Sequence, residues 1–184
     1  MDVALLVPQL VDGAVPGLAD LLIDCVDGGA SVGFLAPLAR EHAEQWWGEL
    51  LRTDGIRAWV AFDGDRSVVG CVLLSLASPD NARHRAEVRK LLVHRSARGR
   101  GVASRLMDRV EEDAAALGRT LLLLDTETGS SAETLYRGRG WAPFGVVPDH
   151  ARRPDGTLAD TTFMLKTLVA PGKAWVSRVS SSAS

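Results

Sequence analysis

The sequence predicts a mixed α/β fold in a single domain, with one central sheet of about seven strands. Apolar segments 58–62 and 68–77 flank Asp63-Gly64, a turn dipeptide that favours an antiparallel hairpin. Farther along the chain, an amphipathic helical segment joins two strand-like runs, 85–93 and 120–125, as in a parallel crossover. Antiparallel pairs with one crossover indicate a mixed sheet, and the expected order of elements is β-α-α-β-β-β-α-β-α-β-β.

The N-terminal part is expected to contain one strand and two helices before the hairpin. Residues 3–8 are a short apolar run that is typical of a strand. Apolar side chains recur at helical spacing over 15–26, and a glycine-rich break follows over 27–34. A second helix is expected over 37–51, with Pro37 at its start, where the missing N–H costs little.

The C-terminal part is expected to alternate helices and strands. A helix is predicted over 102–117, where apolar residues recur with the period of an α-helix, and Gly118 ends it. Residues 120–125 are mostly apolar, as in a strand covered on both faces. Ser130 and Glu133 have the capping-box spacing that starts a short helix. The two closing strands and the loop between them are expected at 141–147, 161–168 and 148–160.

The chain of 184 residues is long enough for one domain with its own hydrophobic core. We expect this domain to span 1–169 and a polar, serine-rich, flexible tail to follow over 170–184. Cys25 and Cys71 have neither disulfide nor metal-ligand spacing, so we expect two reduced thiols and no metal site. With no secretory leader and no long apolar run, the sequence predicts a cytoplasmic protein without a membrane partner.

Charge is distributed unevenly along the sequence. The formal net charge is −2, yet segment 83–109 contains nine arginine and lysine residues and only two acidic ones. A basic segment in an otherwise acidic protein favours a small anionic ligand over a long nucleic-acid track. The segment carries no recognised nucleic-acid-binding motif, and few aromatic residues accompany it, so no nucleic-acid partner is expected.

Within this segment, the turn 98–104 separates a predicted strand from a predicted helix. Gly99, Gly101 and the downstream Asp125 imitate a dinucleotide-binding fingerprint, but Ser104 occupies its third glycine position and the chain has one βαβ unit. Another interpretation is a pyrophosphate cradle made of backbone N–H groups and the positive end of the helix. A glycine-eased turn with solvated arginines is the purely structural alternative.

Two motifs resemble those of the GCN5-related N-acetyltransferase (GNAT) superfamily. The spacing Arg98-x-x-Gly101-x-Ala103 matches its [QR]-x-x-G-x-[GA] turn, and the stretch AETLYRGRGW at 132–141 resembles its second motif. The resemblance also includes the order of elements and implies a GNAT-like central mixed sheet. Segment 121–166 further resembles the branch that contains tabtoxin-resistance acetyltransferases.

This resemblance implies that acetyl-CoA is the cosubstrate. In such enzymes the strand before the turn is splayed from its neighbour and pairs with pantetheine, which here implies backbone contacts from Leu92 and Val93. Many relatives have an asparagine where this chain has Gly129, and Ser130 or Ser131 would have to replace it. The residues expected to hold the pyrophosphate are Arg98, Gly99, Arg100, Gly101, Val102, Ala103 and Ser104.

The resemblance also implies catalytic roles. Tyr136 matches the tyrosine that protonates the departing thiolate, a task that suits a weak acid; its alternative role is a packed aromatic. The attacking amine must first lose a proton, and Glu87 stands eleven residues before Arg98, as the base does in histone-acetylating members. Glu87 could instead pair with a neighbouring arginine. Asp125 is the rival base or an ammonium-binding group, and His84 is a weaker candidate.

Acceptor-binding residues are expected in segment 28–38 and in the loop after Pro148. Phe34 and either Trp46 or Trp47 would wall this site, or else form helix–helix core contacts. The sequence therefore predicts an acetyl-CoA-dependent N-acetyltransferase, monomeric or homodimeric, in which a primary amine of a small molecule attacks directly. The acceptor would be an antibiotic, a toxin or an amino-acid-like compound. Acetylation of a protein lysine or N-terminus and a non-catalytic acyl-CoA sensor are the alternatives.

Overall fold

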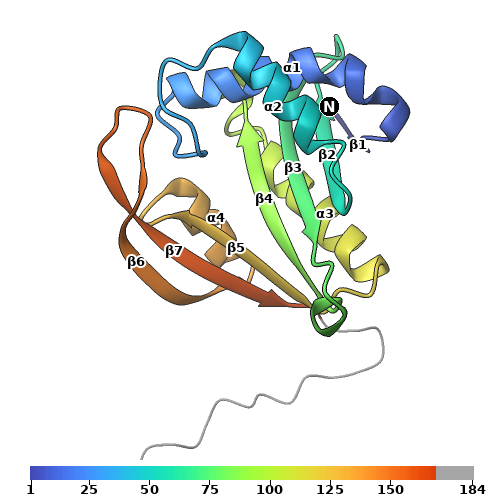
Figure 1. Ribbon diagram of the computed structural model, residues 1–184, viewed down its shortest axis with the longest axis vertical. Helices are drawn as coiled ribbons and strands as arrows, with labels where there is room; N and C mark the ends of the chain where they lie inside the picture. Colours follow the sequence, from blue (N-terminus) through green and yellow to red (C-terminus); the bar gives the residue numbers. More distant parts are fainter. Residues whose placement is uncertain (169–184) are drawn as a thin grey trace, which may run out of the picture.

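The computed structural model describes residues 1–168, which form four α-helices and a seven-stranded sheet in the predicted order (Figure 1). The strands are β1 (Asp2–Leu5), β2 (Ile56–Phe62), β3 (Val68–Leu76), β4 (Arg85–Val93), β5 (Leu121–Glu127), β6 (Ala142–Arg152) and β7 (Leu158–Thr167). The helices are α1 (Val11–Asp27), α2 (Arg40–Leu50), α3 (Val102–Ala116) and α4 (Ser131–Gly138). Segment 170–184, the expected flexible tail, lies outside the described residues.

The sheet is mixed, as predicted. Its strand order is β1-β2-β3-β4-β5-β7-β6, and only the central pair of β4 and β5 is parallel. These two strands pair over 85–87 and 121–123 and then separate. Figure 1 shows them diverging from that end, so that β1 to β4 form one arm of an open V and β5 to β7 form the other.

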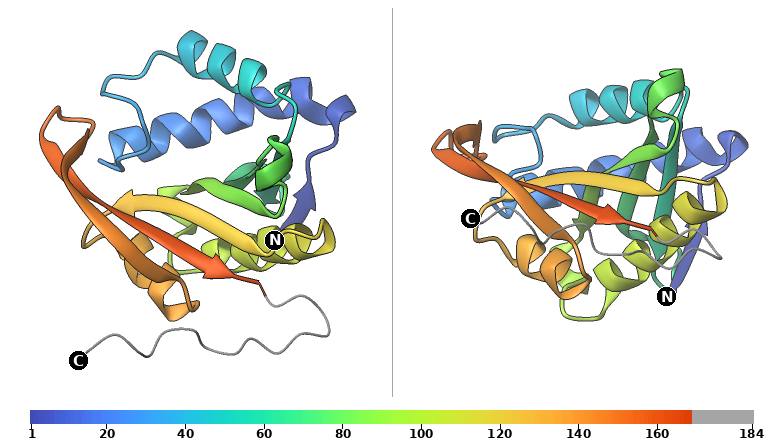
Figure 2. Two further views of the ribbon diagram at one scale, coloured as in Figure 1. Left: turned by 60° about the horizontal axis from the view of Figure 1, so that its bottom comes forward. Right: turned by 90° about the horizontal axis from the view of Figure 1, so that it is seen from below.

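Helices cover both faces of the sheet (Figure 2). Alternate residues of β3 face two separate core clusters, because successive side chains of a strand point to opposite faces. Val72 and Leu74 pack in the cluster under α3, whereas Cys71 and Leu73 pack in the cluster under α1 and α2. Helix α4 packs against β5. Among residues 1–168, no helix is both long and apolar enough to span a bilayer.

Two helix boundaries differ from the predicted ones. α1 begins at Val11 and runs through Pro16, because Val11 and Ala14 are buried in the core and tertiary packing outweighs the poor local propensity. α2 begins at Arg40, so Pro37 precedes the helix instead of starting it.

Two strand boundaries also differ. A short 3-10 turn, Pro8–Leu10, follows β1, so this strand ends before the predicted residue 8. The predicted loop 148–160 is mostly a hairpin, because β6 continues to Arg152 and β7 begins at Leu158. β6 is one of the two edge strands and nearly all of its residues are exposed, so its sequence lacks the apolar alternation of a half-buried strand.

Helix α3 approaches the sheet closely at Gly70 of β3. A Cβ atom on Gly70 would lie 2.9 Å from Cγ1 of Val102, 3.0 Å from Cδ1 of Leu106 and 3.0 Å from the carbonyl oxygen of Leu92. Val102 and Leu106 are fully buried at the start of α3. The missing side chain at Gly70 therefore determines how closely the first turn of α3 packs against β3 and β4.

Gly70→Ala should destabilise the fold and displace the start of α3. The new methyl group meets backbone as well as side chains, so we expect a loss of about 1–3 kcal/mol in the free energy of unfolding, as for an overpacked core. Gly64→Ala, in the turn of the same hairpin, is the matched control because its Cβ would meet nothing within 4 Å. Urea unfolding measures both variants, and equal stability of Gly70→Ala and the wild type would contradict this packing argument.

Candidate active site

The separation of β4 from β5 exposes part of the backbone of β4. Pairing with β5 ends at Glu87, so residues 88–93 have no hydrogen-bonded strand on that side. Leu92 and Val93, the expected pantetheine contacts, lie in this stretch. Unpaired N–H and C=O groups of a strand can bind an extended ligand through main-chain hydrogen bonds.

A β-bulge lies in the middle of β4. The register with β3 shifts between Cys71 and Leu73, and Lys90 has a left-handed φ of 53°. Val88 and Leu92, which would share a face in a regular strand, lie in opposite core clusters. The bulge therefore re-aims the side chains of the strand beside the cleft.

The turn after β4 fits a pyrophosphate. Gly99 and Gly101 both have φ near +75°, a backbone conformation that favours glycine, and a Cβ on either would meet nothing within 4 Å. Gly101 is the N-cap of α3, and no side chain caps the helix there. No acidic residue occupies its first turn. The N–H groups of residues 101–104 thus point from the positive end of a 15-residue helix, where an anion is favoured.

The arginines of the turn have different partners. Arg100 forms an ion pair with Asp63 of the β2–β3 turn at 3.0 Å, which partly neutralises its charge. Arg98 donates from Nε to the carbonyl oxygen of Val93 at 3.4 Å. Because Arg100 is paired, the backbone N–H groups at the start of α3 are the candidate anion-binding feature of this turn that depends least on its arginines.

Asp24 of α1 anchors the segment that leads into this turn. Its carboxylate accepts hydrogen bonds from the backbone N–H and from Nε of Arg95, both at 2.8 Å, and lies 3.5 Å from Nε2 of His94. Burial by itself raises the pKa of Asp24, but the hydrogen bonds from Arg95 outweigh it and hold this pKa below its ordinary value. The sequence patterns did not point to Asp24, because it is 71 residues from Arg95 and only the fold brings the two together.

The start of α4 has the predicted capping box. The Ser130 hydroxyl accepts from the Glu133 N–H at 3.1 Å, and the Glu133 carboxylate accepts from the Gly129 N–H at 2.7 Å. Ser130 is therefore engaged in the cap, whereas Ser131 is exposed at the first position of the helix. Of the two serines expected near the coenzyme, Ser131 has the more accessible side chain.

Tyr136 lies near the end of α4 and is 6% exposed. Its ring centroid is 6.0 Å from that of Trp141, so the aromatic body packs in the core. Burial raises the pKa of Tyr136 well above its ordinary value, and the negative charge of Asp125 raises it further. The phenol is therefore fully protonated at neutral pH and can act as a proton donor.

Glu87 and Asp125 are carboxylates on adjacent strands where the cleft opens. Leu124 packs in the core under α3, so Asp125 faces the opposite side of the sheet, as does Glu87 of β4. Glu87 is in register with Leu123, two residues before Asp125, and its nearest charged partner is Arg89 at 3.9 Å. Among residues 1–168, no group of three or more His, Cys, Asp and Glu side chains is arranged to hold a metal ion.

His84 does not lie with these carboxylates. It precedes the paired end of β4, where its carbonyl oxygen accepts from the Thr120 N–H at 2.7 Å. This position is at the closed end of the V, away from the turn that fits the pyrophosphate, so the weaker candidate base lies outside the opening.

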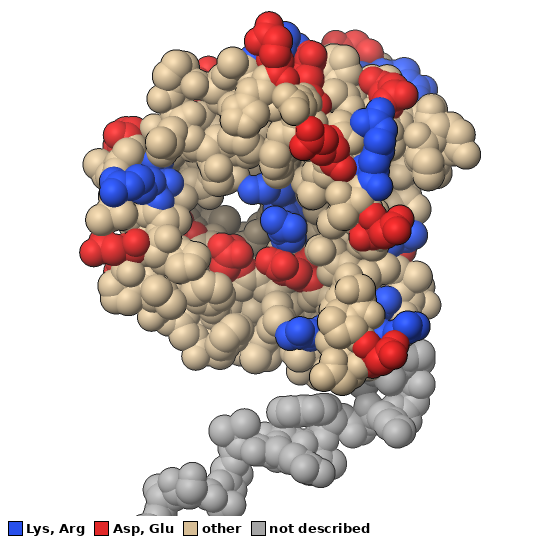
Figure 3. Space-filling view, viewed as in Figure 1, with Lys and Arg blue, Asp and Glu red and all other residues tan. Residues whose placement is uncertain are grey.

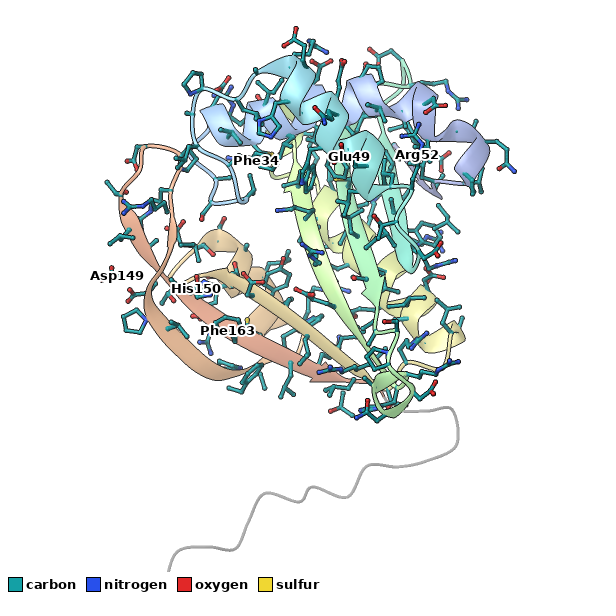
Figure 4. All side chains as sticks on the ribbon, viewed as in Figure 1. Phe34, Glu49, Arg52, Asp149, His150 and Phe163 are labelled. Carbon is teal, nitrogen blue, oxygen red and sulfur yellow. The ribbon has the colours of Figure 1, made fainter. Side chains whose placement is uncertain are left out.

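The aromatic residues expected at the acceptor site divide between the cleft and the core. Phe34 and Trp46 are partly exposed, with edge-to-face rings 5.1 Å apart. Trp47 has no exposed surface and packs under α1 and α2, which corrects its assignment to the acceptor site. Figure 4 shows Phe34 on one side of the open space and His150 and Phe163 on the other. The last two rings are edge-to-face at 5.3 Å.

Lys90, at the bulge, is a residue of this region that the sequence patterns did not indicate. Its Nζ donates to the carbonyl oxygen of Val32 at 2.6 Å and lies 5.8 and 5.3 Å from the ring centroids of Phe34 and Trp46. Burial lowers the pKa of Lys90, and the charge of Arg89 lowers it further. Figure 3 shows basic and acidic side chains together around a central hollow. The available signal was the basic pair Arg89-Lys90 directly before the apolar end of the strand, Leu91-Leu92-Val93.

Comparison with protein-family models matches residues 21–141 to the Acetyltransferase (GNAT) family. The matched region contains the splayed strands, the glycine turn and Tyr136. The chain belongs to the GNAT acetyltransferase family. Family membership confirms the predicted fold and the predicted enzyme class, an acetyltransferase.

Two proteins of Azospirillum brasilense are similar to this GNAT chain in sequence. One, described as IAA acetyltransferase, is 36% identical over 83 residues, which are 43% of this chain and 52% of that protein. The other, an uncharacterized N-acetyltransferase in the hisH-hisA intergenic region, is 32% identical over 139 residues, or 74% of this chain and 82% of that protein. The first match thus spans about half of its relative, and the second spans most of it.

A solved structure shares the fold of this GNAT chain. The GNAT superfamily phosphinothricin acetyltransferase (Pat) from Sinorhizobium meliloti, crystallised in complex with AcCoA, has a TM-score of 0.75 and 20% sequence identity. The superposition covers 91% of this chain and 89% of that chain.

Asp24→Asn should weaken the binding of acetyl-CoA although Asp24 does not touch the turn 98–104. Loss of the charge-assisted bonds to Arg95 loosens the segment before the turn, and we expect the Kd to rise about tenfold. Asp27→Asn, at the exposed end of the same helix, is the matched control. Isothermal titration calorimetry measures both, and equal Kd values for the two variants would show that Asp24 does not anchor the site.

The stability contributed by Asp24 should depend on pH in a defined direction. Because the pKa of Asp24 is lower in the fold than its ordinary value of 3.8, its contribution is present at neutral pH and is lost as the pH falls through the lowered pKa. The melting temperatures of the wild type and Asp24→Asn should therefore differ at pH 7 and converge in acid. A difference that grows in acid would contradict the assigned hydrogen bonds.

Proposed function

We propose that this GNAT enzyme transfers the acetyl group of acetyl-CoA to a primary amine of a small molecule by direct attack. The observation that carries the proposal is the splay of β4 and β5, which begins at Glu87 and runs to the glycine turn. An extended thioester could lie along β4 with its phosphates at that turn. Its acyl end would then reach the opening between Glu87 and Asp125.

The chain's own residues fit acetyl-CoA as the cosubstrate. The N–H groups from Gly99 to Ser104 would bind the pyrophosphate. The backbone at Leu92 and Val93, where the Val93 carbonyl oxygen now accepts from the side chains of Arg98 and Cys25, would bind the pantetheine arm. Ser131, exposed at the start of α4, is the proposed replacement for the asparagine of many relatives. The S. meliloti phosphinothricin acetyltransferase, which shares this fold, was crystallised with AcCoA.

Two proton transfers are assigned to this chain. Bound acetyl-CoA supplies the thioester, whose carbonyl carbon the neutral amine attacks. Glu87 or Asp125, directly or through water, takes the proton that the ammonium group must lose before attack. Tyr136 then donates its phenolic proton to the departing sulfur, which becomes the CoA thiol, and the tyrosinate takes up the second proton that the nitrogen loses as the amide forms. Cys71 is no alternative nucleophile, because burial strongly raises the pKa of its thiol and keeps it protonated.

A small acceptor is favoured by the contacts across the opening. The Ala36 N–H donates to the Pro154 carbonyl oxygen at 3.0 Å, and the Ser31 hydroxyl donates to the Arg152 carbonyl oxygen at 3.4 Å. These contacts join the α1–α2 loop to the β6–β7 turn and leave less room for a polypeptide. Accessible carboxylates in the opening suit a cationic amine. The resemblance to tabtoxin-resistance acetyltransferases favours an amino-acid-like, antibiotic or toxin acceptor.

A thiol-release assay with a panel of amines tests this proposal. Small primary amines should release CoA thiol faster than peptides with a free lysine or N-terminus at equal concentration. Faster release with the peptides would instead support a protein acetyltransferase. Binding of acetyl-CoA without release for any acceptor would support the non-catalytic sensor.

Tyr136→Phe should lower kcat while leaving cosubstrate binding intact. General acid catalysis contributes at least about 100-fold, so we expect kcat to fall by about that factor. Phenylalanine keeps the packing against Trp141, and the Kd for acetyl-CoA and the melting temperature serve as controls. A variant that turns over like the wild type would refute the acid role of Tyr136.

Glu87→Gln and Asp125→Asn should distinguish the two candidate bases. The variant that removes the base should lose about 100-fold in kcat at pH 7, whereas the other should retain most of its activity. Each variant's Kd for acetyl-CoA, measured in parallel, separates a chemical defect from a binding defect. Nearly full activity in both variants would contradict both assignments.

A further inference from the structure

Lys90 lies where the strand proposed to bind the cosubstrate meets the loop proposed to bind the acceptor. The acceptor loop is defined here as residues 28–39, between α1 and α2. The left-handed backbone of Lys90 at the bulge, with φ of 53°, accompanies a side chain that reaches this loop. Its ammonium group donates to the carbonyl oxygen of Val32 at 2.6 Å. A Cβ on Gly33 would lie only 3.2 Å from Nζ.

Aromatic rings form the other side of this ammonium site. Nζ of Lys90 lies 5.8 Å from the ring centroid of Phe34, in the acceptor loop, and 5.3 Å from that of Trp46, in α2. Both distances are within the range of cation–π attraction, which strengthens as the charge is removed from water. One charge-assisted hydrogen bond and two aromatic rings thus stabilise the partly buried charge of Lys90.

The rest of the acceptor loop has few fixed points. Its start is held by the end of α1, where the Ala30 N–H donates to the Cys25 carbonyl oxygen at 3.0 Å. Its end is held by Leu38, which is 8% exposed in the core. Between these two fixed points, Ser31 donates a hydrogen bond to the end of β6 and Ala36 donates one to the β6–β7 turn. Val32 and Phe34 of this central stretch also pack against the core cluster under α1 and α2, and Lys90 adds a hydrogen bond from β4 to the carbonyl oxygen of Val32.

We propose that Lys90 is a positioning residue that holds the acceptor loop in place for its contact with the β6–β7 turn. The loop and the turn would then enclose the acceptor, so Lys90 would determine how well small amines bind without itself taking part in proton transfer. This inference rests on the proposed function for the identity of the enclosed ligand. The loop geometry on which it depends is independent of that function.

Lys90→Met tests the proposal because methionine keeps most of the apolar stem and removes the charge and the donor. We expect hydrogen exchange of the Ala36 amide to become about tenfold faster, as for the loss of a charge-assisted hydrogen bond. The KM for the amine acceptor should rise about tenfold, while the KM for acetyl-CoA and kcat should change less than about twofold. Lys90→Arg keeps the charge and can reach the same carbonyl. It should therefore keep the exchange rate of the Ala36 amide and the acceptor KM close to their wild-type values.

Lys166→Met is the matched control. Lys166 also donates to a backbone carbonyl, that of Arg139 at 2.8 Å, and also has a partly buried side chain, but it lies on the other arm of the sheet. The Lys166→Met variant should leave the hydrogen-exchange rate of the Ala36 amide and the acceptor KM unchanged. If hydrogen exchange of the Ala36 amide became equally faster in Lys166→Met and in Lys90→Met, the effect would reflect a general loss of stability and would overturn the proposal.

The remaining outcomes separate the two proposals. Unchanged exchange of the Ala36 amide in Lys90→Met would overturn the positioning role. Faster exchange with an unchanged acceptor KM would overturn the role in acceptor binding. Faster exchange together with a wild type that acetylates no amine would support the positioning of the loop and overturn the proposed function.

Discussion

β4 and β5 are joined by three residue pairs, and the cleft exists because the pairing stops there. The core cluster under α3 is continuous across both strands and includes Leu122 of β5, Met164 of β7 and Val88 of β4. The cluster under α1 and α2 ends at Leu92 and includes no residue of β5, β6 or β7. The two arms are therefore held together on one face by α3 and are free to separate on the other. The open side of the V faces the acceptor loop.

The helix that holds the arms together also begins at the proposed anion site. Its N-terminus begins at Gly101, directly after β4, and its first buried residue, Val102, contacts the sheet at Gly70. On one side, the start of α3 packs closely against the sheet. On the other side, the N–H groups of residues 101–104 are open toward the cleft between β4 and β5. The ion pair of Arg100 with Asp63 reduces the charge of the basic segment at this site. With this pairing, an arginine-rich turn is compatible with the proposed binding of a single small anion in a protein with a net charge of −2.

The sequence was most informative where a local pattern determines a local structure. The hairpin turn at Asp63-Gly64, the capping box at Ser130 and Glu133, and the amphipathic period of α3 predicted their elements because each depends on neighbouring residues. Both strands of the β6–β7 hairpin were predicted, but their continuation over 148–152 and 158–160 was missed because an exposed edge strand needs no apolar pattern. Asp24 was missed because its contact with Arg95 depends on tertiary packing alone. Trp46 and Trp47 are adjacent in sequence, and only the orientation of α2 decides which one is buried.

We propose that the splayed strand and the glycine turn form one continuous binding site for acetyl-CoA. A crystal structure of the complex tests it most directly. We expect the pyrophosphate within hydrogen-bond distance of the N–H groups of residues 101–104, and the pantetheine arm along Leu92 and Val93. The thioester should lie in the opening between β4 and β5, within reach of the Tyr136 hydroxyl. A pyrophosphate bound away from the start of α3, or a pantetheine arm outside the splay, would contradict it.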